Sequence, residues 1–139
     1  AYKGIPLASA ISTILNLRSS KPFPFAFDRK EAKSHGEGGS IVGELKDKRV
    51  LIVDDVLTAG TALKQSIDTI NSEGGTVVGS LVALDREEIL HGALARDIIL
   101  NDFSIDVMSI ARISQLVEFF YLSDREEEAT TIKNYLTSL

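Results

Sequence analysis

The residues best suited to chemistry are two adjacent carboxylates, Asp54 and Asp55, which directly follow an apolar run. A short segment of small and hydroxyl-bearing residues comes next, from Thr58 to Thr61, ahead of an amphipathic stretch. A helix N-terminus offers unpaired N–H groups and the positive end of its dipole, so this segment can bind a phosphate. The carboxylates would repel that phosphate and favour hydroxyl groups or a hydrated cation. A phosphorylated sugar with free hydroxyls satisfies both halves, whereas the alternative is an ordinary acidic turn with a threonine cap.

A second cluster of chemically capable residues precedes this segment. The sequence RKEAKSHGEGG, over residues 29–39, gathers three fixed positive charges and one histidine among glycines. Cations in a closing loop would stabilise negative charge on a phosphorylated leaving group and exclude water. The alternative is a solvated charged loop. Neither G-x-x-x-x-G-K-[ST] nor G-x-G-x-x-G occurs in the chain, which excludes the two commonest nucleotide-binding loops.

The elements that must position these residues follow from the apolar periodicity. In the first half the pattern predicts a helix over 5–17, a short strand over 23–27, a long loop over 28–48 with an extended stretch at 41–42, a strand over 49–53 buried on both faces, and a helix over 61–72. In the second half it predicts a strand over 76–84, a helix over 87–100 that is broken or delayed near Gly92, and a strand over 104–110. A helix around 113–121 and a last helix capped by Ser123 and Glu126 follow. This order predicts an α/β fold with a mainly parallel twisted sheet flanked by helices.

Composition narrows the function classes. The chain has 139 residues, enough for a single domain, and no cysteine, so neither disulfides nor thiolate metal sites are possible. No apolar run approaches the roughly 20 residues needed to cross a bilayer, and the start lacks the layout of a signal peptide. The net charge of −5 disfavours nucleic acid as a partner.

The segment Val50 to Ala62 resembles the signature of the type I phosphoribosyltransferases, which bind 5-phosphoribosyl 1-pyrophosphate (PRPP). The resemblance implies that the two carboxylates face the ribose hydroxyls and that the loop after them wraps the 5-phosphate. The implied PRPP contacts in this segment are Asp54, Asp55, Val56, Leu57, Thr58, Ala59, Gly60, Thr61 and Ala62.

The basic segment resembles the catalytic loop of the orotate phosphoribosyltransferases specifically. The resemblance implies contacts from Arg29, Lys30, Lys33 and His35 to the pyrophosphate side of PRPP. Lys33 is the expected main catalytic cation, acting together with the two carboxylates. In this family the loop reaches into the partner subunit's active site, so the resemblance also implies a homodimer.

The flanking pieces complete the resemblance. Tyr2 and Lys3 match the family's pyrophosphate loop, and Arg86, with Thr58, matches the residues that hold orotate. An ion pair of Arg86 with Asp85 or Glu87 is the alternative for that arginine. Family members carry a further N-terminal section, with a hood and a first core strand, so residues 1–139 are expected to form one domain that lacks both.

The activity implied by the resemblance is orotate phosphoribosyltransfer in a cytoplasmic enzyme of pyrimidine synthesis. Its cofactor is Mg2+, held mainly through PRPP and water with no direct protein ligand, and neither nucleic acid nor membrane is an expected partner. The alternative is a PRPP-binding regulatory module or an inactive fragment of the same fold.

Overall fold

The computed structural model describes residues 3–28 and 41–137. Its helices are α1 (Gly4–Arg18), α2 (Thr61–Ser72), α3 (Ala95–Phe103), α4 (Ile113–Leu122) and α5 (Glu126–Thr137). Its strands are β1 (Phe27–Asp28), β2 (Ile41–Val42), β3 (Arg49–Leu57), β4 (Thr76–Asp85), β5 (Ile89–Leu90), β6 (Ala93–Leu94) and β7 (Val107–Arg112). The predicted helix over 61–72 is confirmed, and the helices predicted over 5–17 and 113–121 are confirmed within a residue of each end.

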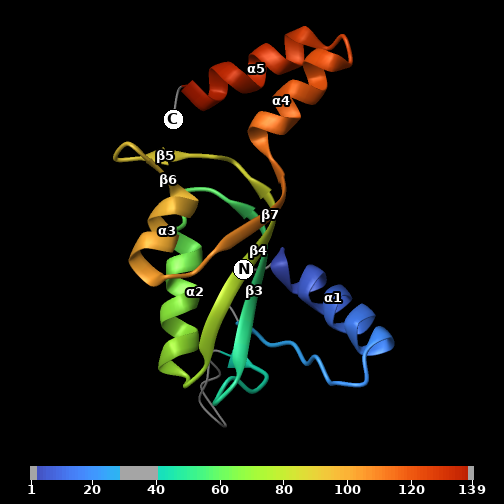
Figure 1. Cartoon of the computed structure of the whole chain (residues 1–139), viewed down its shortest axis with the longest axis vertical. Coiled ribbons are helices and arrows are strands. Elements are labelled where there is room, and N and C mark those ends of the chain that lie inside the picture. Colours follow the sequence, from blue (N-terminus) through green and yellow to red (C-terminus); the bar gives the residue numbers. More distant parts are fainter. Residues whose placement is uncertain (1–2, 29–40, 138–139) are drawn as a thin grey trace.

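The centre of the molecule is a parallel sheet in the order β3-β4-β7. Helices α2 and α3 lie on one side of it and α1 lies on the other (Figure 1). The core fills the space between the sheet, α2 and α3, and its buried members are Leu57, Leu63, Ile67, Val82, Ala95, Ile99, Ile105 and Val107. The predicted α/β fold with a parallel sheet is therefore confirmed.

One face of the sheet is covered less completely than the sequence predicts. The apolar run over 49–53 predicts a strand buried on both faces, but Leu51 is 43% exposed. Met108 and Ile110 of β7, which point to the same face by the register and alternation of the strands, are 48% and 77% exposed. That prediction is wrong because α1 packs on β3 and leaves the rest of this face open.

The segment after β4 is a hairpin, not the predicted start of a helix. Strands β5 and β6 pair antiparallel around His91 and Gly92, which have φ angles of 52° and 85°. Positive φ at both central residues is typical of a two-residue turn that matches strand twist. The helix predicted over 87–100 therefore begins only at Ala95.

Three further local predictions differ from the structure. The strand predicted over 23–27 is limited to Phe27 and Asp28, because the backbone of Phe23 exchanges hydrogen bonds with the Asn16 side chain of α1. Ser123 does not cap α5, because that helix begins three residues later, at Glu126. The strand predicted over 104–110 is shifted toward its C-terminal end, as β7.

Candidate functional site

The predicted phosphate loop and Arg86 emerge from the same edge of the sheet. The register pairs Leu57 with Asp85, so β3 and β4 end side by side. The backbone N–H of Arg86 then donates to the carbonyl oxygen of Leu57 at 3.0 Å. Ligands of open parallel sheets bind at this carboxyl edge. The structure thus brings together Thr58 and Arg86, the two residues predicted to hold the base.

The loop over residues 58–60 opens directly into α2, as predicted. Gly60 occupies the N-cap position with a φ of 77°, a left-handed conformation that glycine adopts without strain. No side chain caps this helix, so the N–H groups of its first turn are not taken up by a capping residue. An uncapped helix N-terminus that follows a tight loop is a suitable place for the phosphate.

The two carboxylates lie within β3, because the strand continues to Leu57, beyond the predicted end at Val53. The backbone N–H of Asp55 donates to Oδ1 of Asp54 at 2.9 Å. Burial raises the pKa of Asp54 above its ordinary value, and this hydrogen bond opposes the rise only in part. The Asp54 carboxyl therefore sits where a hydroxyl donor from a ligand would compensate its lost solvation.

The beginning of α1 is packed closely against this strand. A Cβ added at Gly4 would lie 2.6 Å from the carbonyl oxygen of Val53 and 3.0 Å from Oδ1 of Asp54. Next to it, Lys3 Nζ lies 3.6 Å from Oδ2 of Asp55, with 82% of the lysine side chain exposed. An exposed pair of this kind is weak, so Lys3 can turn toward an anion beside the carboxylates. Lys3 is thus brought to the site, as predicted.

Several of the predicted site residues lie outside the described residues. These are Tyr2, Arg29, Lys30, Lys33 and His35. The strands that border the basic segment do pair, with Phe27 opposite Val42 and Asp28 opposite Ile41. The roles given to the basic residues stay predictions.

Arg86 has neighbours that the sequence did not predict. Its Nη2 lies 3.0 Å from Oε1 of Glu88 and hydrogen-bonds the hydroxyl of Tyr135, and its guanidinium lies 5.1 Å from the centre of the Tyr135 ring. Neither Asp85 nor Glu87 pairs with it, so the predicted alternative ion pair is wrong. Tyr135 is separated from Arg86 by 49 positions, and no local spacing in the sequence could indicate the contact.

The carboxylates on either side of Arg86 bind Arg96 instead. Arg96 Nη1 lies 2.6 Å from Oδ2 of Asp85, which is 2% exposed, and 3.3 Å from Oε1 of Glu87. The other oxygen of Glu87 accepts the backbone N–H of Ser114, at the start of α4, at 2.9 Å. Burial alone would raise the pKa of Glu87, but the hydrogen bonds from Ser114 and Arg96 hold it below its ordinary value. This network fixes the turn that carries Arg86.

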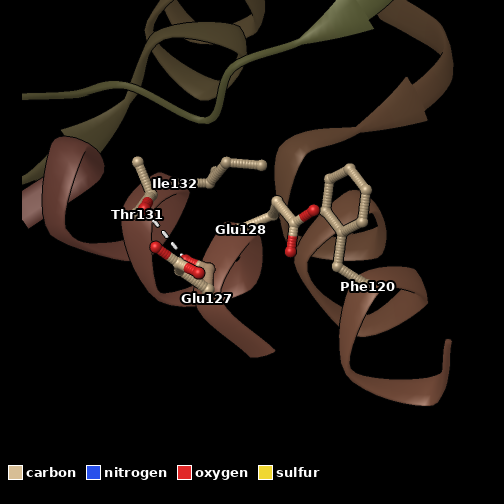
Figure 2. A pocket seen from close by; sticks show the side chains of 5 residues that line it. All are labelled: Phe120, Glu127, Glu128, Thr131 and Ile132. Atoms are coloured by element: carbon tan, nitrogen blue, oxygen red, sulfur yellow. Dashed lines mark hydrogen bonds between the residues drawn. The ribbon is translucent and has the colours of Figure 1, made fainter. Parts of the chain in front are cut away.

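A hollow between α4 and α5, of about 520 Å3, is the other candidate for a ligand site (Figure 2). Its described lining is Phe120, Glu127, Glu128, Thr131 and Ile132, with no basic side chain among them. The lining carries two carboxylates, and the nearby Arg125 is already paired with Glu128 at 2.7 Å, so this hollow disfavours a phosphate. Among the described residues there is also no cluster of three or more metal-ligating side chains, and no helix long and apolar enough to cross a membrane. The edge of the sheet is therefore the site that fits the predicted ligand.

Comparison with known proteins decides the family. The family model described as "Phosphoribosyl transferase domain" matches residues 1–100 of the chain. The chain belongs to this phosphoribosyltransferase family. This chain also superposes on solved structures of the family. The type I phosphoribosyltransferase fold predicted from the sequence is therefore confirmed.

The chain is similar to proteins that are named orotate phosphoribosyltransferase. It is 47% identical to an orotate phosphoribosyltransferase of Pseudomonas syringae pv. tomato, over 91% of the chain and 59% of the relative. It is 42% identical to orotate phosphoribosyltransferase 2 of Saccharomyces cerevisiae, over 97% of the chain and 63% of the relative. The crystal structure of a Francisella tularensis orotate phosphoribosyltransferase matches with a TM-score of 0.76 and 34% identity, over 99% of this chain and 64% of that one. The chain thus spans about three fifths of the length of these relatives.

Proposed function

We propose that the protein is an orotate phosphoribosyltransferase, which transfers the 5-phosphoribosyl group of PRPP to orotate and gives orotidine 5′-monophosphate and pyrophosphate. The observation that carries this proposal is the hydrogen bond from the Arg86 N–H to the Leu57 oxygen. Leu57 directly precedes Thr58, so this bond places the Arg86 guanidinium beside the loop over 58–60. The guanidinium is suited to a planar anion, and the loop is suited to a phosphate. The similarity to proteins named orotate phosphoribosyltransferase supports the same substrate pair.

In the proposed reaction the bond from the ribose anomeric carbon to the pyrophosphate oxygen breaks, and its electron pair leaves with the pyrophosphate. A ring nitrogen of orotate bonds the anomeric carbon and gives up its proton to the pyrophosphate or to water. The first turn of α2 and the loop over 58–60 hold the 5-phosphate through backbone N–H groups. Asp54 and Asp55 accept hydrogen bonds from the ribose hydroxyls and so fix the sugar as positive charge develops on it. Arg86 and Thr58 orient the orotate.

The basic residues are proposed to bind the departing pyrophosphate and to stabilise its negative charge. Lys3 lies beside Asp55, and Tyr2, Arg29, Lys30, Lys33 and His35 are proposed to join it. Of these, Lys33 is the proposed main source of electrostatic stabilisation for the leaving group. The carboxylate pair also fits a hydrated Mg2+ that is bound mainly by substrate oxygens and water, because this ion takes few protein ligands. When bound, Mg2+ would neutralise charge on the pyrophosphate.

The proposed working form is a homodimer in the cytoplasm, with the basic loop of one subunit entering the site of the other. Sedimentation velocity at concentrations near those of the assay tests the oligomer, and the proposed form sediments as a dimer. A monomer with full activity would contradict the sharing of the loop.

Asp54→Asn is expected to weaken PRPP binding by about 10- to 100-fold, because it replaces charged hydrogen bonds to the ribose with neutral ones. The raised pKa of Asp54 adds a signature in pH. In the wild type PRPP affinity should fall as the pH drops through this pKa, which lies above 3.8, because the protonated carboxyl no longer accepts both bonds. The asparagine variant should lose that component of the pH dependence.

Isothermal titration of PRPP with Mg2+ across a pH series measures both effects. Asp68→Asn is the matched control, since Asp68 is an exposed carboxylate on α2 and should bind PRPP like the wild type. Equal affinities and equal pH profiles for the two variants would remove Asp54 from the ribose site.

A further inference from the structure

The Arg86 side chain is held at its far end by a residue from a distant element. Its backbone is already fixed, because its N–H bonds Leu57 and its neighbours Asp85 and Glu87 are tied to Arg96. What remains free is the long side chain, and a flexible arginine must be ordered before it can hold a ligand. The contacts with Tyr135 of α5 do that ordering.

The contacts fix both the position and the plane of the guanidinium. The Tyr135 hydroxyl accepts from Nη2, and the centre of its ring lies 5.1 Å from the guanidinium carbon. Oε1 of Glu88 lies 3.0 Å from the same Nη2 as an ion pair. Glu88 sits two residues from Arg86 in the same turn, whereas Tyr135 comes from the last helix, which lies beyond the β5–β6 hairpin in Figure 1. Tyr135 therefore anchors the guanidinium to a separate part of the fold.

The anchored geometry leaves one edge of the guanidinium available. The hydrogen bond to Tyr135 and the ion pair with Glu88 both use Nη2, and within residues 3–28 and 41–137 no acceptor bonds Nε or Nη1 of Arg86. An edge with two parallel N–H groups matches a carboxylate or a pair of adjacent ring acceptors. The Nε and Nη1 groups of Arg86 are thus available to a ligand at the carboxyl edge of the sheet, next to the loop over 58–60.

We infer that Tyr135 is a positioning residue for the base-binding arginine: it holds Arg86 so that its Nε–Nη1 edge faces the planar anionic substrate. The inference rests on the proposed function, since it names the group that prepares the same site for orotate. It predicts that α5, remote in sequence from the PRPP signature, selectively controls the affinity for the base. PRPP binding, which uses the helix N-terminus and the carboxylates, should be independent of Tyr135.

The test is steady-state kinetics of the complete protein with Tyr135→Leu and Tyr135→Phe. Tyr135→Leu should raise the KM for orotate about tenfold, the loss that corresponds to one hydrogen bond to a charged group. The KM for PRPP should stay within about twofold of the wild type. Tyr135→Phe keeps the ring over the guanidinium and loses only the hydroxyl, so the rise should be smaller, about threefold. Tyr121→Leu removes an exposed tyrosine from α4 and serves as the matched control, with both KM values unchanged.

The outcomes separate the inference from the proposed function. An active wild type whose orotate KM is unchanged in both Tyr135 variants would overturn the inference alone. A parallel rise of both KM values would overturn it as well, because that result is expected of a residue that only supports the fold. A wild type without orotate-dependent turnover would overturn the proposed function and the inference with it. Should Tyr135→Leu fail to fold, as judged by circular dichroism, the Tyr135→Phe variant decides by the same criterion.

Discussion

Arg96→Leu is expected to lower the free energy of unfolding by about 3–5 kcal/mol, because it leaves the buried Asp85 without its charge partner. Asp85 is 2% exposed and lies 2.6 Å from Arg96, so solvent cannot replace the lost partner. The variant also removes the 3.3 Å contact to Glu87 and so loosens the turn that carries Arg86. Denaturant unfolding should show a lower midpoint with an unchanged slope.

A matched control and a pH series sharpen this prediction. Arg125→Leu breaks an exposed pair with Glu128, whose side chains are 52% and 44% exposed, and should cost at most about 1 kcal/mol. The lowered pKa of Glu87 means that its stabilising contribution is present above its ordinary value of 4.5 and is lost as the pH falls through the lower value. Arg96→Leu should weaken that acid-sensitive component. Equal losses of stability in the two leucine variants would show that the Asp85–Arg96 pair is no more important than a surface pair.

Lys33→Ala in the complete protein is expected to lower kcat by about 100- to 1,000-fold with only a modest loss of PRPP affinity. The reason is that a cation acting on the departing pyrophosphate is needed most in the transition state, where the negative charge develops. Single-turnover measurement of pyrophosphate release at saturating PRPP and orotate isolates this step. Lys46→Ala removes an exposed lysine downstream of the basic segment and should leave turnover unchanged. Near wild-type turnover of Lys33→Ala would exclude that lysine as the main catalytic cation.

Much of the phosphate-binding half of the site could be predicted, because its determinants are local. Leu63, Ile67 and Ile70 give α2 its buried face by their spacing alone, and all three are buried. Glycines at positions 60 and 74 predict where that helix begins and ends, and both have the positive φ angles that glycine adopts readily. A strand, a glycine-containing loop and a helix in this order place the loop at the carboxyl edge without any knowledge of distant contacts.

The half of the site around Arg86 could not be predicted in the same way, because distant contacts decide it. Glu87 to Leu90 have good helix propensity, and the local pattern favoured a helix. The ion pairs of Arg96 with Asp85 and Glu87 and the turn at His91 and Gly92 select a hairpin instead. Tyr135 of α5 lies 49 positions after Arg86, and β5, β6, α3, β7 and α4 come between them in the sequence. Such contacts have no periodicity to reveal them, and they override a propensity worth a few tenths of a kcal/mol per residue.

The central claim is that PRPP and orotate react at the edge formed by the loop over 58–60, the carboxylates of β3 and Arg86. Isothermal titration of PRPP with Mg2+ into the purified protein, followed by addition of orotate and an assay for released pyrophosphate, tests it most directly. We predict saturable PRPP binding and pyrophosphate release that depends on orotate. PRPP binding without any release would favour a regulatory module or an inactive fragment over a transferase. A folded protein that binds no PRPP would contradict the assignment of the phosphate site itself.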